Sequence, residues 1–403
     1  MGGRANDGEI MPFEVHVEDS VLDDLRQRLA LTRWPDQIPG SGWERGADSG
    51  YLRALVDYWR NDFDWRAAER AQNIWPQFLT TLDGARVHFF HVRSPHPEAM
   101  PLMLTHGWPS TPLEFLEVMG PLTDPTSYGG RAEDACHVVA PSLPGFGWSL
   151  PTTESGWHPG RIARAWLELM ARLGYERFAA HGTDWGSVVS TEMAREAPER
   201  LVGLHLTLLE SRLRPRNGVL TPEEEHQQQA NEALRATELG YVMLQSTKPQ
   251  TLSYALADSP VGQAAWIVEK LRTWTDCAGD LESVLTRDEI LTSVTTFWAT
   301  GTGGSSGRLY HEARLAALGS TPRQGRIEVP TAVALFPREL YPTSRRIAAE
   351  NYNIVRWTPM ARGGHFGAWE QPELLVADLR AFLAGLQARW EVFTSEIPEE
   401  KSW

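Results

Sequence analysis

The amino-acid sequence predicts an α/β fold: a mostly parallel sheet flanked by helices, with an inserted helical lid and an N-terminal helical extension. Short apolar runs alternate with amphipathic stretches from residue 101 to about 211, and again from residue 331. This alternation is typical of strand–helix–strand units in a parallel sheet. Between the two parts, residues 221–318 carry helical patterns and almost no strand signal, as an inserted lid would.

Composition narrows the class of protein. The chain has 403 residues, of which 42% are hydrophobic and 22% are charged, so it can bury a large core. Its net charge of −14 disfavours nucleic acid and anionic membrane surfaces as partners. No apolar run is long enough to span a membrane and no signal peptide is visible, so we expect a cytoplasmic protein without a membrane partner. Its two cysteines, Cys136 and Cys277, are then reduced thiols, and a homodimer is the commonest oligomer to expect.

The N-terminal part reads as helices followed by a strand pair. Leu22, Leu25 and Leu29 recur at helical spacing, and residues 51–59 repeat that pattern. The turn pair Asp83-Gly84 then joins two expected strands, at 77–82 and 86–92. The predicted segments are residues 1–84 as a helical region wrapping the core, 85–211 as the first part of the core, 212–320 as the lid, and 321–395 as the second part of the core.

The core and lid elements follow in order. Expected core strands are 102–105, 137–140, 178–180, 201–209, 331–335 and 354–357, with helices at 111–119, 162–173, 187–196, 345–350 and from Pro372 onward. In the lid, 222–239, 260–274 and 287–298 read as helices. The stretch 301–307, GTGGSSG, predicts a flexible loop because of its glycine and serine content.

The sharpest motif is Gly182-Thr183-Asp184-Trp185-Gly186, placed between an expected strand and an expected helix. Small residues on both sides permit the strained turn of a nucleophile elbow, which exposes its central side chain, here Asp184. In α/β-hydrolases one oxyanion-hole N–H comes from the residue after the nucleophile and another from the loop after the third strand. Those residues would be Trp185 and, in His106-Gly107-Trp108-Pro109, Trp108.

The base and its acid are sought by chain order, since the base of this fold comes last. His365, in Gly363-Gly364-His365-Phe366, lies between the last expected strand and the last helix. Glu339 follows the strand at 331–335 and is well placed as the acid. Glu210, at the end of the preceding strand, is its serious competitor.

An aspartate nucleophile selects alkyl electrophiles, because its attack on an alkyl carbon leaves an ester that activated water can cleave. The candidates are epoxides and alkyl halides. An opening epoxide needs a proton donor such as a tyrosine hydroxyl, whereas a departing halide needs only N–H donors. Tyr241 and Tyr310 in the lid could face the cleft.

The joint motifs resemble those of the epoxide hydrolases of the α/β-hydrolase fold, in the branch similar to microsomal epoxide hydrolase. They span residues from about 12 to 385 and include HGWPS (106–110), HGTDWGS (181–187), GYVMLQSTKPQT (240–251), LFPREL (335–340) and RGGHFGAWEQPELL (362–375). The resemblance implies Asp184 as nucleophile, His365 as base, Glu339 as acid, and Tyr241 with Tyr310 as the ring-opening pair. The membrane-anchoring segment of the microsomal enzyme has no counterpart here, which implies a soluble form.

The expected reaction turns an epoxide and water into a vicinal diol through an ester on Asp184, with Trp108 and Trp185 at the oxyanion hole. It requires neither a metal nor an organic cofactor. The surplus of 17 Trp, with Trp148 and Trp266 as possible pocket residues, favours a bulky or aromatic epoxide. The alternatives are a haloalkane dehalogenase and a non-catalytic α/β-hydrolase module that only binds a ligand.

Overall fold

A computed structural model describes residues 8–209, 215, 218–319, 325–387 and 390. Its centre is a nine-stranded sheet in the order β1-β2-β3-β5-β4-β6-β7-β8-β9. The strands are β1 (Met11–Phe13), β2 (Gln77–Leu82), β3 (Ala85–Val92), β4 (Met100–Thr105), β5 (Cys136–Pro141), β6 (Phe178–Gly182), β7 (Leu201–Leu206), β8 (Ile327–Leu335) and β9 (Tyr352–Pro359).

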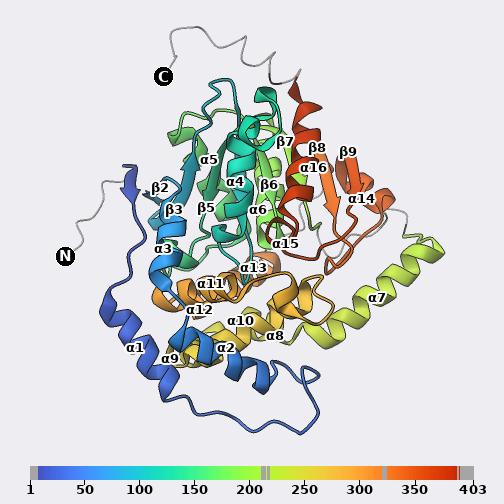
Figure 1. Cartoon of the computed structure of the whole chain (residues 1–403). Coiled ribbons are helices and arrows are strands. Elements are labelled where there is room, and N and C mark those ends of the chain that lie inside the picture. The colour runs from blue at the N-terminus through green and yellow to red at the C-terminus, as the bar shows by residue number, and fades with distance from the viewer. Residues whose placement is uncertain (1–7, 210–214, 216–217, 320–324, 388–389, 391–403) are drawn as a thin grey trace.

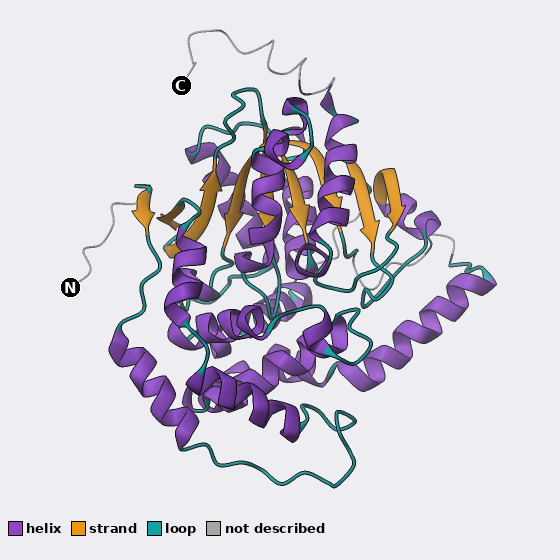
Figure 2. Cartoon of the chain, in the orientation of Figure 1, coloured by secondary structure: helices purple, strands orange, loops and turns teal. Residues whose placement is uncertain are grey.

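The sheet is antiparallel at one edge and parallel elsewhere. Neighbours from β1 through β3 to β5 pair antiparallel, and those from β5 onward to β9 pair parallel, which confirms the predicted fold class (Figure 2). The edge strand β1 was not predicted, because three residues carry no periodicity. Its Pro12 fits this position, since an edge strand leaves one row of backbone groups unpaired.

Helices cover both faces of the sheet, so successive strand residues are buried on opposite sides. Val138 and Ala140 of β5 join a core cluster with α4 (Leu116–Thr123) and α16 (Pro372–Ala384). Val139 joins the other cluster, which contains residues of α5 (Pro159–Arg172) and α6 (Asp184–Glu196). The remaining short core helices are α14 (Arg345–Asn351) and α15 (Gly367–Glu370).

The lid is a group of helices beside one end of the sheet (Figure 1). They are α7 (Pro222–Glu238), α8 (Gly240–Thr247), α9 (Pro249–Asp258), α10 (Pro260–Trp274), α11 (Arg287–Ala299), α12 (Thr302–Ser305) and α13 (Arg308–Leu318). The prediction of a flexible loop at 301–307 is wrong, because α12 lies there and packs on α9. A Cβ on Gly303 would lie 2.3 Å from Oε1 of Gln263, so glycine serves close packing here.

The N-terminal extension lies along the lid. Its helices are α1 (Asp19–Ala30), α2 (Ser49–Asn61) and α3 (Trp65–Asn73); α1 and α2 contact α10, and α3 contacts α11. Nε1–H of Trp59 donates to Oγ1 of Thr295 at 2.9 Å, and Arg28 donates to the carbonyl of Asp258 at 2.9 Å. The extension thus fastens the lid from outside.

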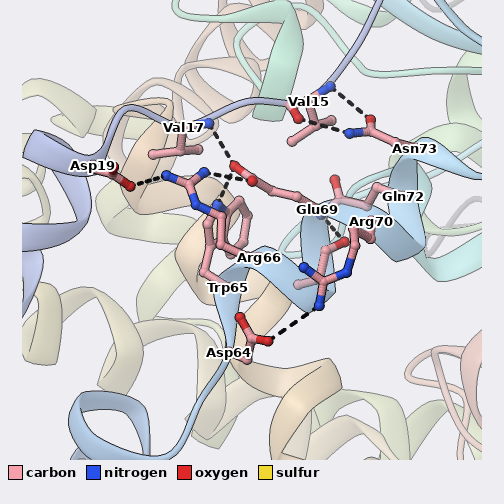
Figure 3. A network of polar contacts seen from close by, with 11 residues as sticks. Val15, Val17, Asp19, Asp64, Trp65, Arg66, Glu69, Arg70, Gln72 and Asn73 are labelled. Carbon is pink, nitrogen blue, oxygen red and sulfur yellow. Dashed lines mark hydrogen bonds and ion pairs between the residues drawn. The ribbon is translucent and has the colours of Figure 1, made fainter.

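A buried carboxylate anchors the segment that joins β1 to α1 (Figure 3). Glu69 of α3 accepts the backbone N–H of Val17 at 2.7 Å, Nε1–H of Trp65 at 2.7 Å, and Nη1–H of Arg66 at 2.6 Å. Asn73 binds both the N–H and the carbonyl of Val15.

Within the described residues, no helix is both long enough and apolar enough to cross a membrane.

Candidate active site

Asp184 lies on a tight turn between β6 and α6. Its φ of +46° is in the left-handed region, which is strained for a residue other than glycine. The turn needs small neighbours: a Cβ on Gly186 would lie 1.8 Å from the carbonyl oxygen of Thr105, and one on Gly182 would lie 2.3 Å from that of Gly186. This is the geometry of a nucleophile elbow.

The loop after β4 reaches the carboxylate of Asp184. The backbone N–H of Trp108 donates to Oδ1 of Asp184 at 2.8 Å. A Cβ on Gly107 would lie 2.1 Å from the same Oδ1, so only glycine lets the loop approach this closely. Trp185 stands in the first turn of α6, where backbone N–H groups have no acceptor within the helix.

His365 and Glu339 form a buried pair beside Asp184. Glu339 follows β8 and His365 follows β9, and Oε1 of Glu339 lies 2.6 Å from Nδ1 of His365. Nε2 of His365 lies 3.5 Å from Oδ2 of Asp184. The competing Glu210 lies outside the described residues.

Charge and burial act in opposite directions on His365. Burial lowers its pKa, but the negative charges of Glu339 and Asp184 and the hydrogen bonds with them outweigh burial and hold the pKa well above its usual value. The carboxylate pair thus favours an imidazolium ion as long as Asp184 is ionised. Removing the charge of Asp184 removes one of these two anions, so His365 becomes easier to deprotonate.

The two lid tyrosines face this group. Tyr241 of α8 and Tyr310 of α13 are 7% and 6% exposed, and their ring centroids are 5.8 Å apart. The ring of Tyr241 stacks on Trp108 at 4.9 Å, and the ring of Tyr310 meets Trp185 edge-on at 4.8 Å. Burial raises the pKa of both hydroxyls well above the usual value, and the negative charge of Asp184 raises it further.

Trp274, at the end of α10, completes the aromatic surroundings and was missed by the sequence analysis. The centroid of its ring lies 5.9 Å from that of Trp108, 5.2 Å from that of Tyr241 and 5.2 Å from that of the His365 imidazole. Its backbone carbonyl accepts the backbone N–H of His365 at 2.9 Å. No motif marks it, because it ends an ordinary amphipathic helix. We call the following set the aromatic wall: Trp108, Trp185, Tyr241, Trp274 and Tyr310.

Of the two further tryptophans expected at the pocket, Trp148 lies elsewhere, whereas Trp266 packs against the core cluster that contains Trp108 and Tyr241. Trp148, expected to line the pocket, packs instead in a cluster with Val17 and Trp65 and donates to Oε1 of Gln72 at 3.3 Å. Trp266 donates to Oε1 of Gln245 at 3.2 Å within the lid.

In the part of the chain that the structure describes, no group of three or more His, Cys, Asp or Glu side chains could hold a metal ion.

The parallel sheet with its elbow, inserted lid and His–Glu pair defines an α/β-hydrolase. A family model described as alpha/beta hydrolase fold matches residues 100–336, and one described as Epoxide hydrolase N terminus matches residues 10–115. The chain is 46% identical to a putative epoxide hydrolase of Stigmatella aurantiaca, over 94% of this chain and 86% of the relative. It is 37% identical to epoxide hydrolase 1 of Sus scrofa, over 95% and 90% of the two chains.

Comparison with solved structures also finds epoxide hydrolases. The crystal structure of juvenile hormone epoxide hydrolase from Bombyx mori superposes with a TM-score of 0.85 and 27% identity, over 95% of this chain and 96% of that one. The epoxide hydrolase of Aspergillus niger gives 0.83 and 30%, over 94% and 97%. The chain belongs to the epoxide hydrolase family, which confirms the predicted enzyme class, with a small-molecule epoxide and water as its reactants.

Proposed function

We propose that this enzyme converts an epoxide into a vicinal diol through a covalent ester on Asp184. The proposal rests on the different neighbours of the two oxygens of that carboxylate. Oδ1 accepts the N–H of Trp108, whereas Oδ2 lies 3.5 Å from Nε2 of His365. Oδ2 is therefore the atom that attacks, and Oδ1 remains as the carbonyl oxygen of the ester.

In the first step, Oδ2 of Asp184 donates an electron pair to one oxirane carbon. The bond from that carbon to the epoxide oxygen breaks, and the oxygen takes a proton from Tyr241 or Tyr310, leaving a hydroxyalkyl ester and a tyrosinate. Negative charge leaves Asp184 in this step. The repulsion that opposes ionisation of both tyrosines therefore weakens while one of them gives up its proton.

In the second step, His365 acts as a base, with Glu339 fixing the ring through Nδ1. Formation of the ester removes the charge of Asp184, so the imidazolium releases its Nε2 proton to bulk water and becomes the neutral imidazole that this step needs; the proton is taken up again once Asp184 is ionised. Nε2 takes a proton from water, whose oxygen attacks the carboxyl carbon of Asp184. The N–H groups of Trp108 and Trp185 stabilise the negative charge on Oδ1.

The bond between the carboxyl carbon and the diol oxygen then breaks. His365 gives its proton to the released alkoxide, and the new carboxyl group gives its proton to the tyrosinate. Both transfers together regenerate the enzyme. One oxygen of Asp184 leaves in the diol and is replaced by the oxygen of water.

The aromatic wall favours a bulky or aromatic epoxide. Its five members supply ring faces and edges beside the nucleophile, which suit an apolar or aromatic substituent. The −14 net charge gives no reason to expect an anionic substrate. Styrene oxide is therefore the first test substrate.

The test is turnover of styrene oxide, followed by a single turnover with excess enzyme in water labelled with ¹⁸O. The expected result is a diol, with the label in the peptide that contains Asp184 and not in the diol. A diol that carries the label from the first turnover would refute the ester. Halide release from a chloroalkane without diol from any epoxide would make the enzyme a dehalogenase, and binding without turnover would make it a ligand-binding module.

A further inference from the structure

A buried lysine lies against the ring of Tyr241. Lys270 of α10 is 7% exposed, and its Nζ lies 5.1 Å from the centroid of the Tyr241 ring. Its Nζ also lies 5.8 Å from the ring centroid of Trp274. The steps above give this lysine no part.

Two carboxylates keep the ammonium group in place. Nζ lies 2.7 Å from Oε2 of Glu269, its neighbour on α10, and 3.3 Å from Oε2 of Glu238 at the end of α7. The ammonium group is thus held between two carboxylates on one side and the ring of Tyr241 on the other. A cation close to an aromatic ring is attracted by the ring electrons, and more strongly once the ring carries negative charge.

Tyr241 is otherwise poorly suited to give up a proton. Burial, the charge of Asp184, the hydroxyl of Tyr341 and the carboxylate of Glu238 all raise its pKa, and the hydrogen bond with Tyr310 lowers it. A hydroxyl in this environment is a weak acid unless something stabilises its conjugate base. The cation that the structure records at the Tyr241 ring is Lys270, whereas the Tyr310 ring meets Trp185, Trp108 and Tyr241.

We propose that Lys270 is a positioning residue that makes Tyr241 the proton donor of the tyrosine pair, by stabilising the negative charge that appears on its ring. As the epoxide carbon–oxygen bond breaks, the hydroxyl proton of Tyr241 passes to the epoxide oxygen, and the phenolate left behind faces the ammonium group. Tyr310 then holds the epoxide oxygen by a hydrogen bond and keeps its own proton. This assignment rests on the proposed ester mechanism.

The experiment measures the two chemical steps separately in single turnovers of styrene oxide, by quenched-flow mass spectrometry of the alkyl-enzyme. In Lys270→Met we expect alkylation to slow about tenfold, a change between the effects of an exposed and of a desolvated cation–ring interaction, while ester hydrolysis stays within about twofold. Lys270→Arg, which keeps the charge, should restore most of the alkylation rate. If Lys270 only held α7 and α10 together, its replacement would not slow alkylation while leaving ester hydrolysis unchanged.

A double-mutant comparison identifies the ring on which Lys270 acts. Tyr241→Phe keeps the ring but cannot form a phenolate, so adding Lys270→Met to it should change alkylation by less than about twofold. In the Tyr310→Phe background the same change should again slow alkylation about tenfold. Equal losses in both backgrounds, or a wild-type rate in Lys270→Met, would overturn the proposal.

Two further variants separate charge from packing. Lys270→Gln is the second neutral variant, because its amide can still donate to Glu238 and Glu269, and thermal unfolding checks that each variant is folded. Glu238→Gln removes the ion pair between α7 and α10 but keeps the cation, and we expect its alkylation to match or exceed that of the wild type. A tenfold loss in Glu238→Gln would show that the ion pair, not the charge at the ring, matters. If the wild type forms no ester, the ester mechanism itself fails, and the comparison of variants does not arise.

Discussion

Nε2 of His365 lies 3.5 Å from Oδ2 of Asp184, while its Nδ1 lies 2.6 Å from Glu339. The imidazole thus stands between the proposed nucleophile and the carboxylate that contacts its other nitrogen. Oδ2 is left to the substrate, because Oδ1 is bound by the N–H of Trp108.

Replacing the nucleophile should abolish turnover. Asp184→Ala removes the atom that attacks, and Asp184→Asn offers an uncharged amide that is a far weaker nucleophile. We expect diol formation from styrene oxide to fall by about four orders of magnitude or more. The measurement is chromatographic diol detection, with circular dichroism to show that the fold is retained. Residual activity above about one per cent would assign the attack to another residue.

Replacing the base should trap the ester. His365→Gln can still be alkylated at Asp184 but cannot deprotonate water, so the intermediate accumulates. Intact-protein mass spectrometry should show a gain equal to the mass of the epoxide. His226→Gln, an exposed histidine of α7, should show no adduct and normal turnover. A folded His365→Gln protein without adduct would contradict the scheme.

Removing both lid hydroxyls should block the first step. In the double variant Tyr241→Phe with Tyr310→Phe the rings stay but no proton reaches the epoxide oxygen, so alkylation should fall at least about a hundredfold. Tyr254→Phe changes a tyrosine that is 72% exposed and should react normally. Full activity in the double variant would remove both residues from the mechanism.

A single methyl group at Gly107 should misplace the nucleophile. The Cβ of Gly107→Ala would stand 2.1 Å from Oδ1 of Asp184, so the carboxylate or the loop must move. A displacement of about 1 Å costs about a hundredfold in rate, and we expect a loss of that order in kcat. Gly319→Ala, where a Cβ would lie 3.5 Å from the carbonyl of Leu315, is the control and should leave kcat unchanged.

Glu114 should make the stability of the protein depend on pH. Its carboxyl group is 2% exposed and accepts the hydroxyl of Thr183 at 2.7 Å, and burial raises its pKa to about 7 from 4.5. The folded form therefore holds this proton between pH 4.5 and 7 while the unfolded form loses it. The contribution is fully present below pH 4.5 and is lost as the pH rises through 7.

Glu114→Gln should not lose stability as the pH rises through this range. Between pH 4.5 and 8, the free energy of unfolding of the variant should gain about 3 kcal/mol relative to the wild type, in urea titrations at each pH. Glu117→Gln, which changes an exposed neighbour, should follow the wild type across this range. A constant difference between Glu114→Gln and wild type would mean that Glu114 is ionised throughout.

Local patterns predicted much of the fold and of the candidate site. The spacing of Gly182 and Gly186 marks the elbow because the turn tolerates no Cβ at either position, and that requirement is visible in the sequence. Asp184, His365 and Glu339 each follow a strand of the parallel sheet, whose carboxyl ends meet at one edge. The positions of the three residues after strands of one parallel sheet therefore predicted that they lie close together.

What the sequence could not predict depends on contacts between distant segments. Trp274 and Lys270 lie on a lid helix whose orientation over the core leaves no local signal. The glycines at 303 and 304 look flexible by composition, yet they form α12 because Gln263 and Ser253 press against them. The same residue type serves a loose linker or a tight contact, and only the packed neighbours decide which.

The hydrogen bond from Trp59 to Thr295 has a thermodynamic consequence for the reaction. It belongs to an extension whose helices α1, α2 and α3 contact the lid helices α10 and α11, so these contacts of the lid form during folding and do not wait for a substrate. The binding energy of an incoming epoxide is therefore not needed to order these helices. The order of the lid thus depends partly on residues 19–73 of the chain, the span from α1 to α3.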